Sequence, residues 1–261
     1  MTDITLTNKL LLQFTSLFWK SMDWLYPPRC CNCDRWGFVL CEDCFKLIEP
    51  LNGNLCKKCG HPIFGKSSFC EECRLSPPPY TQMRSWTSHT DPTRKAIHAL
   101  KYKRNLVIGR ILAHPLIEMI EKSGWQIDLV VPIPLSKTRM RTRGYNQAAL
   151  ISRYLATSLN IQHSTKCVKR VRDTSTQIDM DVNKRFTNLL DAFYANPATL
   201  KKRNILIVDD VITTGATMHN CAKAILNAGA EKIYCLSVAR AILRHEKHHQ
   251  GLASNSALQS L

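Results

Sequence analysis

The sequence lacks the features that would place it in a membrane or export it. Residues 1–26 contain no basic leader and no cleavage site of small residues, and Lys20 and Asp23 interrupt their apolar positions. This segment therefore falls short of the roughly 20 apolar residues that a spanning helix needs. The chain also has no domain with an N-terminal nucleophilic cysteine, so we do not expect it to deliver ammonia from glutamine. These absences predict a cytoplasmic protein without a transmembrane segment.

Acidic residues are scarce as well. The chain has 20 Asp and Glu against 36 Lys and Arg, which gives a formal net charge of +16. If eight cysteines bind two Zn²⁺ as thiolates, these sites contribute about -4 and leave about +12. Such a basic chain favours polyanionic partners, and phosphorylated substrates and nucleic acid are both compatible with it.

Cysteines, in contrast, are abundant and regularly spaced. Eight of the 12 form four Cys-x2-Cys pairs: Cys30/Cys33, Cys41/Cys44, Cys56/Cys59 and Cys70/Cys73. This spacing lets two thiolates approach one tetrahedral metal ion, whereas disulfide scaffolds do not favour it. The pairs therefore predict a double zinc ribbon with two structural Zn²⁺ ions, each bound by two successive pairs.

Some features of this ribbon module remain open. The first pair could share an ion with the third, and Cys31 could compete with Cys30 as a ligand. The module could be an adaptor for nucleic acid or protein, or a metal-stapled lid on a larger domain. Three other cysteines lie in apolar periodic segments and are expected in the core: Cys167, Cys221 and Cys235.

Proline clusters and composition divide the chain. Residues 1–26 have apolar positions near helical spacing and predict an amphipathic docking helix, with attachment to a membrane surface as the alternative. Pro27-Pro28 opens the ribbon module, and Pro77-Pro78-Pro79 closes it. The expected parts are residues 1–26, the double zinc ribbon at 27–76, an α/β domain at 80–240, and a disordered tail at 241–261.

The segment 204–217 is the strongest sign of function. An apolar run from Asn204 leads into Asp209 and Asp210, followed by a turn of small residues and a helical pattern. A strand that is apolar on both faces belongs in a parallel sheet, which binds ligands at the carboxyl ends of its strands. The turn can hold a phosphate through backbone N–H groups and the helix dipole. Its residues are Thr213, Thr214, Gly215, Ala216 and Thr217.

The two carboxylates have a different task from the turn. Since they would repel a phosphate at close range, we expect them to accept hydrogen bonds from sugar hydroxyls or to hold water on Mg²⁺. Adjacent carboxylates also repel each other, so neutralising Asp209 and Asp210 should leave stability unchanged or raise it.

Three other segments supply basic or polar candidates. Lys101 follows an amphipathic helix, and a basic loop with Lys137, Arg139 and Arg143 follows the apolar strand 128–134. The polar stretch from Val168 to Val182 shows no clean period, which is typical of a functional loop or lid. The candidate lid residues are Arg172, Thr174, Gln177 and Arg185.

These segments, in this order, resemble the ComF/GntX family of competence protein F relatives over about residues 22–240. The acidic strand end and its turn are similar to the 5-phosphoribosyl 1-diphosphate (PRPP) signature of type I phosphoribosyltransferases. Asn204 and Phe186 depart from the family pattern, and neither lies in the turn. Besides the cysteine pairs, the resemblance is carried by Pro27-Pro28-Arg29-Cys30, Leu100-Lys101-Tyr102, Val131-Pro132-Ile133-Pro134-Leu135, Arg141-x-Arg143-Gly144-Tyr145-Asn146-Gln147-Ala148, Arg172-x-Thr174-x-x-Gln177 and Arg185-x-x-Asn188.

The resemblance implies a parallel-sheet phosphoribosyltransferase-like domain behind a double zinc ribbon, and a role in DNA uptake during natural competence. As an enzyme it would transfer a pentosyl group, a nitrogen nucleophile displacing pyrophosphate from PRPP in the presence of Mg²⁺. Asp209 and Asp210 would grip the ribose, and the 213–217 turn the 5-phosphate. Arg143, with Lys101, Lys137 and Arg139, would neutralise the pyrophosphate.

The sequence leaves the nucleophile unidentified, so a second class of function stays open. In this alternative the chain binds PRPP or a nucleotide as a sensor, without turnover, and its basic surface and ribbons bind single-stranded DNA. Other competence proteins would be its partners.

We expect the purified protein to contain about two zinc ions per chain, because eight paired thiolates fit two tetrahedral sites. Cys59→Ser should remove one of them and loosen the ribbon module first. Metal analysis that finds no zinc in a reductant-protected, chelator-free preparation would reject this prediction.

Overall fold

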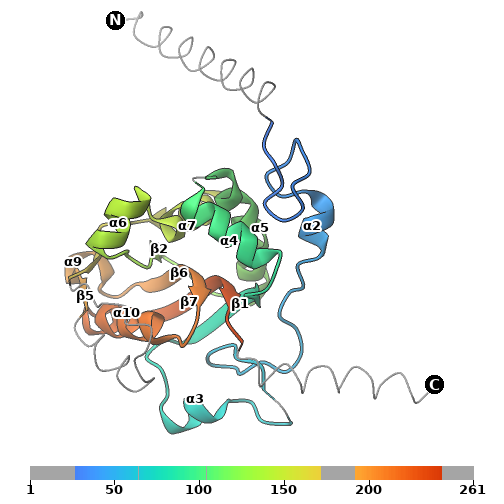
Figure 1. The fold of residues 1–261 in the computed structure, drawn as a ribbon. Coiled ribbons are helices and arrows are strands. Elements are labelled where there is room, and N and C mark those ends of the chain that lie inside the picture. Colours follow the sequence, from blue (N-terminus) through green and yellow to red (C-terminus); the bar gives the residue numbers. More distant parts are fainter. Residues whose placement is uncertain (1–26, 64, 104, 172–191, 243–261) are drawn as a thin grey trace, which may run out of the picture.

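A computed structural model describes residues 27–63, 65–103, 105–171 and 192–242. Its centre is a five-stranded sheet in which every pair of neighbours is parallel (Figure 1). The parallel-sheet fold expected from the sequence is thus confirmed. In sheet order the strands are β1 (Gln82–Ser88), β7 (Lys232–Arg240), β6 (Asn204–Ile212), β2 (Leu129–Pro132) and β3 (Gln162–His163).

Strand β6 occupies the middle of the sheet because its residues are apolar on both faces. Ile205 and Ile207 point into one hydrophobic cluster, and Leu206 and Val208 into the other. Such a strand is stable only where helices cover both faces of the sheet. Because the apolar side chains of β6 alternate between the two faces of the sheet, each face must be covered by a layer of helices.

Those layers lie on opposite sides of the sheet (Figure 1). The helices α4 (Thr93–Tyr102), α5 (Val107–Ser123) and α7 (Gln147–Ser158) pack on the Leu206 side. Helix α10 (Ala216–Asn227) packs on the Ile205 side, where Cys221 and Cys235 are buried in the core as expected. Cys167 lies in the same cluster.

Two segments differ from the sequence expectation. The basic segment after β2 was expected to be a loop but forms the helix α6 (Lys137–Arg143). Ser136 Oγ accepts a hydrogen bond from the backbone N–H of Arg139, and Gly144 ends the helix with a φ of 78°. These two caps enclose good helix formers, which explains the difference.

The second difference is a small antiparallel pair beside α10. It consists of β4 (Val168–Arg170) and β5 (Phe193–Ala195), and the short helix α9 (Pro197–Leu200) follows it. The start of the segment expected to be irregular is thus a strand. The predicted docking helix at 1–26, the lid residues Arg172, Thr174, Gln177 and Arg185, and the tail beyond residue 242 lie outside the described residues.

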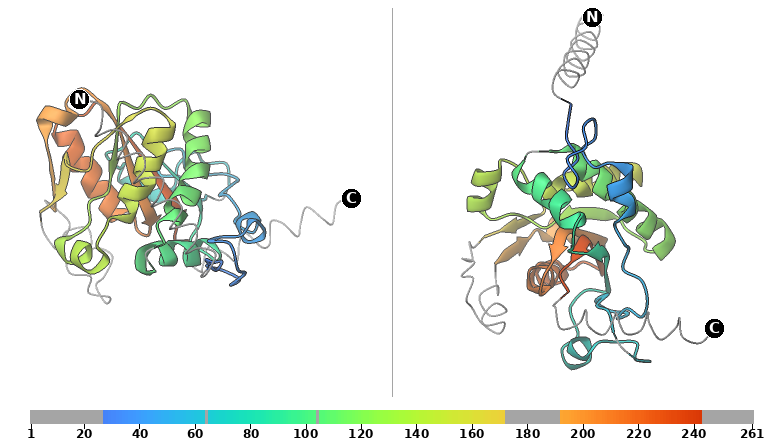
Figure 2. Two further views of the ribbon diagram at one scale, coloured as in Figure 1. Left: turned by 90° about the horizontal axis from the view of Figure 1, so that it is seen from above. Right: turned by 45° about the vertical axis from the view of Figure 1, so that its right-hand side comes forward.

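The ribbon module packs against both faces of β1. It contains α2 (Glu42–Lys46) and α3 (Glu71–Leu75), and Figure 2 shows the chain running from α2 past the edge of the sheet to α3. On one face Phe45 stacks on Trp86 with ring centroids 5.7 Å apart. On the other, Cys56, Cys59 and Cys70 pack with Met83.

Between these contacts, residues 49–60 line the outer edge of β1. The backbone N–H of Leu51 donates to Trp86 O (2.7 Å), and that of Met83 to Lys58 O (2.8 Å). The Thr87 hydroxyl donates to Glu49 O (2.6 Å). The module thus hydrogen-bonds the edge strand that the sheet leaves open.

Within the part of the chain that the structure describes, no helix has the length and apolar character required to cross a membrane.

We expect Gly60→Ala to loosen the contact between the ribbon module and β1. Gly60 has a φ of 67°, and a Cβ there would lie 2.7 Å from Met83 O. Left-handed strain of about 1–2 kcal/mol then adds to an overpacking cost of about 1–3 kcal/mol. Gly53→Ala is the matched control, since Gly53 also has positive φ (89°) but open space around it. Urea unfolding should show the larger loss at Gly60, and equal losses would refute the close approach.

Candidate functional site

The candidate site lies at the carboxyl edge of the sheet, where β2, β6 and β7 end side by side. Beyond β2, the backbone N–H of Ile133 donates to Val208 O at 2.9 Å, which keeps this segment beside β6. On the other side, Ile212 of β6 pairs with Arg240 of β7. Because the strands are parallel, the residues after each of them gather at one edge.

The acidic pair stands at the end of β6. Asp210 is only 4% exposed and forms an ion pair with Lys101 Nζ, from the last turn of α4. Gln147 Nε2, at the start of α7, donates to Asp210 Oδ1 at 3.4 Å. The partly buried Asp209 accepts a hydrogen bond from the backbone N–H of Asp210 at 2.8 Å. Two helices that pack on the same face of the sheet, α4 and α7, thus converge on one buried carboxylate.

The two carboxyl groups have different electrostatic surroundings. Burial and the charge of Asp210 raise the pKa of Asp209 well above its ordinary value. Burial alone would raise the pKa of Asp210, but the charge and hydrogen bond of Lys101 outweigh it and hold that pKa below its ordinary value. Hydroxyl donors or a cation at this edge would therefore act chiefly by favouring the ionised form of Asp209.

The turn after the acidic pair leads directly into α10. Gly215 has a φ of 78° and is the N-cap residue of the helix, and Thr214 Oγ1 accepts from the backbone N–H of Ala216 at 3.4 Å. Thr213 and Thr214 are exposed, Thr217 is partly buried, and Ala216 is buried. The first turn of a helix has N–H groups without intrahelical acceptors, which suits this turn to bind an anion.

Of the basic residues predicted on the segment after β2, Arg143 is tied to the site most directly. Its guanidinium lies 5.2 Å from the centroid of the Tyr102 ring and donates to Tyr102 Oη at 3.3 Å. Tyr102 directly follows Lys101, so Arg143 is anchored near the ion pair. Lys137 and Arg139 are exposed on α6, and no ion pair among the described residues joins them to Asp209 or Asp210.

The sequence interpretation missed two residues that the fold brings to this edge. Gln147 was noted only as part of a motif, and its contact with Asp210 depends on the capping of α7 by Asn146. His89 follows β1, and its backbone N–H donates to Arg240 O at 2.7 Å. Burial and the charge of Lys101 lower the pKa of His89, while Asp210 acts in the opposite direction. His89 directly follows β1, and residues that follow a strand of a parallel sheet lie at its carboxyl edge. This place after a strand is the signal that could have identified His89.

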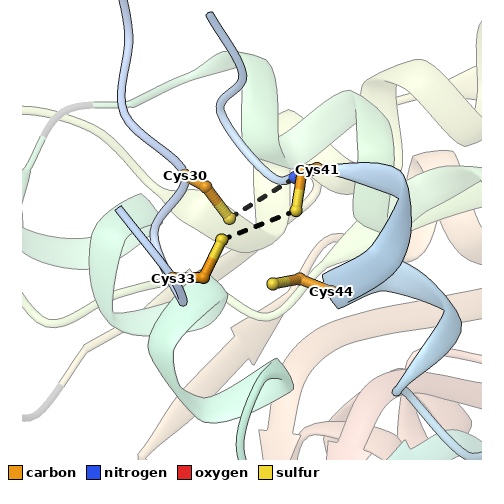
Figure 3. A group of neighbouring side chains, drawn as sticks. All are labelled: Cys30, Cys33, Cys41 and Cys44. Carbon is orange, nitrogen blue, oxygen red and sulfur yellow. Dashed lines mark hydrogen bonds between the residues drawn. The ribbon is translucent and has the colours of Figure 1, made fainter. Parts of the chain in front are cut away.

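The cysteines form two groups of four, built from successive pairs. Figure 3 shows the first, in which Cys30, Cys33, Cys41 and Cys44 converge at the start of α2. The sulfurs of Cys33 and Cys41 are 3.6 Å apart, as are those of Cys59 and Cys70 in the second group. Zinc with four thiolates at about 2.3 Å separates neighbouring sulfurs by about 3.8 Å, so both groups fit the ion. Cys31 belongs to neither group, and the interleaved pairing is wrong.

Sequence comparison agrees with this architecture. A double zinc ribbon domain matches residues 21–74, and a phosphoribosyl transferase domain matches residues 98–256. The DNA utilization protein YhgH of Salmonella typhimurium is 32% identical over 209 residues, covering 77% of this chain and 90% of the relative. Competence protein F of Haemophilus influenzae has the same identity and coverage. The chain belongs to the ComF/GntX family.

Solved structures resemble this ComF-family chain more distantly. An adenine phosphoribosyltransferase is 18% identical, covers 56% of this chain and 76% of its own, and has a TM-score of 0.36. The fold assignment therefore rests on the strand order and on the family match.

The structure changes the expectation for neutralising the acidic pair, because among the described residues Asp210 forms an ion pair and Asp209 does not. Ionised Asp209 is disfavoured in the fold, so its contribution to stability falls as the pH rises above about 3.8 towards its raised pKa. Asp209→Asn should therefore unfold at the same or a higher temperature at pH 7. Asp210→Asn should lose about 1.5–3 kcal/mol, the range for a hydrogen bond to a charged group, because Lys101 loses its carboxylate partner.

Asp210 stabilises the fold above its unfolded pKa, and this stability is lost as the pH falls through its lowered folded pKa. The deficit of Asp210→Asn should thus be complete at pH 7 and shrink in acid. Thermal unfolding of both variants from pH 2 to 8 measures this, because the contribution of Asp210 is lost only below its ordinary pKa of 3.8. Equal losses from the two substitutions at pH 7 would contradict the assigned difference between the carboxyls.

Proposed function

We propose that this chain binds PRPP with Mg²⁺ at the carboxyl edge of its sheet and transfers the phosphoribosyl group to a nitrogen nucleophile. The observation that carries the proposal is the acidic pair at the end of β6, with Asp210 held by Lys101 directly before the N-terminus of α10. Sugar hydroxyls need acceptors and a 5-phosphate needs N–H donors. This edge offers both within a few consecutive residues.

Each group at the edge has a distinct part in the proposed binding. Asp209 and Asp210 accept hydrogen bonds from the ribose hydroxyls, and residues 213–217 hold the 5-phosphate. Carboxylate oxygens are suitable ligands for Mg²⁺ or its bound water, so the acidic pair fits the ion. Bound Mg²⁺ would neutralise charge on the pyrophosphate.

Lys101 and α6 provide the cationic side of the site. Lys101 is 20% exposed in its ion pair, so its ammonium group can turn towards a polyanion without leaving a fully buried position. Arg143 stands beside it on Tyr102, and the exposed Lys137 and Arg139 extend the same positive charge along α6. Together they would stabilise the charge that develops on departing pyrophosphate, which is catalysis by positioning and electrostatics. Arg172, Thr174, Gln177 and Arg185 would close over the site and exclude water.

The cellular role is proposed from the relatives and the charge. Two relatives are named as a DNA utilization protein and a competence protein, and this chain carries a net charge of +16. We therefore place it in the handling of DNA during natural competence, with single-stranded DNA and other competence proteins as partners. The alternative is a PRPP or nucleotide sensor that uses the same edge without turnover.

Calorimetry with PRPP and Mg²⁺ tests the binding step. The wild type should bind, and Asp209→Asn should weaken binding at least tenfold, since a charge-assisted hydrogen bond contributes about 1.5–3 kcal/mol. Thr214→Val should weaken it less, because backbone N–H groups remain. Asp128→Asn is the matched control: its carboxylate accepts from the backbone N–H of Asn204, at the amino end of β6.

Two results would overturn the proposal: no binding by the wild type, or equal affinity in Asp209→Asn. If PRPP binds, a pyrophosphate-release screen over bases and amines separates the two functions. Release with an acceptor supports the transferase, and silence across the screen favours the sensor.

A further inference from the structure

Two arginines of the phosphoribosyltransferase-like domain hold the second ribbon. Arg84 Nη1, from β1, donates to Cys56 O at 3.2 Å and to Lys57 O at 3.3 Å. Arg240 Nη2, from the end of β7, donates to Cys59 O at 2.6 Å. Both guanidinium groups thus reach the Cys56-x-x-Cys59 turn, which supplies half of the ligands of the second four-cysteine group.

In the described part of the chain, these two arginines have no carboxylate partner that balances their charge. Arg240 is only 5% exposed, and its Nε has no hydrogen-bond partner among the described residues. Within the same residues, no ion pair includes Arg84 or Arg240. Burying an unpaired charge is costly, so the fold requires a negative group nearby.

The second metal site provides that group. Zinc with four thiolates carries a net charge of about -2, and the four sulfurs of this group fit the ion. The guanidinium groups of Arg84 and Arg240 carry like charges that repel each other, and the anionic zinc–thiolate centre would attract both.

We propose that the zinc centre of the second ribbon is the counter-charge of Arg84 and Arg240, and that it thereby supports the turn at residues 213–217. The inference goes beyond the proposed function and does not depend on which ligand the turn binds. It makes Arg84 and Arg240 positioning residues of both the metal site and the carboxyl edge.

The path from the zinc centre to the turn is short. Arg240 pairs with Ile212, and the backbone N–H of Ala241 donates to Ile212 O at 2.8 Å, immediately before Thr213. A cavity of about 350 Å³ is lined by Cys59 and Cys73 of the ribbon, by Arg240, and by Thr214 and Gly215 of the turn. The ribbon, the end of β7 and the turn therefore meet around one space.

Zinc release is the first test. In full-length protein loaded with two zinc ions, Arg240→Gln should let a chelator remove one ion about 10–100-fold faster, the range for the loss of an outer-shell partner. The other ion should leave at the wild-type rate. Arg203→Gln is the matched control, because Arg203 donates to Gln162 at the amino end of the sheet, at 3.0 Å. Faster release of both ions, or of neither, would overturn the proposal.

A double-mutant comparison separates charge compensation from general damage. Arg240→Gln should lower the unfolding temperature in the wild type and in Cys41→Ser, which lacks the first zinc site. It should have much less effect in Cys70→Ser, which lacks the second. An equal loss in all three backgrounds would refute the coupling. If Arg240→Gln does not fold, Arg84→Gln, at a less buried arginine, gives the same comparison.

Hydrogen exchange reports on the turn itself, without any ligand. The amides of residues 212–217 and 241 should exchange faster in Arg240→Gln and in Cys70→Ser than in the wild type, and at the wild-type rate in Cys41→Ser. Unchanged exchange of these amides in both Arg240→Gln and Cys70→Ser would refute the support of the turn.

Discussion

The parallel pairing of β6 with β2 and β7 is the constraint on which the rest of the molecule depends. Because β6 is buried on both faces, it needs helical cover on both, and because its neighbours run parallel, their ends meet at one edge. Asp209 and Asp210 directly follow the fully buried run 205–208 of β6. The sheet thus holds two carboxyl groups close together at a position they would not adopt alone, and the ion pair with Lys101 offsets part of that cost.

The zinc ribbons pack against the same sheet and do not form a separate domain. The contact of Phe45 with Trp86 on one face, and of Cys59 with Met83 on the other, leaves β1 enclosed between the two ribbons. Residues 49–60 hydrogen-bond the edge that β7 does not cover. Of the two roles that the sequence left open for this module, these contacts support a metal-stapled cover of the larger domain.

Features with local signals could be predicted, and features that depend on tertiary contacts could not. The cysteine spacing identified both metal sites, and the apolar run before Asp209 identified the central strand, since each pattern lies within a few residues. The basic segment at 137–143 was expected to be a loop because it is rich in arginine. Ser136 and Gly144, which cap a helix there, are equally common in loops. The ion pair of Lys101 with Asp210 and the hydrogen bond of Arg240 to Cys59 O join distant parts of the chain. The sequence indicated Lys101 and Asp210 as residues of one site, but neither contact could be predicted from the residues around it.

The order in which the chain is synthesised determines which partner of β1 is available first. Ser85 of β1 meets Ser237 of β7 across 152 residues, whereas Gln82 reaches Lys57 of the second ribbon across only 25. A chain leaving the ribosome therefore offers β1 a ribbon partner long before its sheet partner exists. A ribbon that has already taken up zinc would shield this strand from other nascent chains, because an unpaired edge is what such chains would otherwise join. Metal supply during translation would then decide how much of the protein reaches its fold.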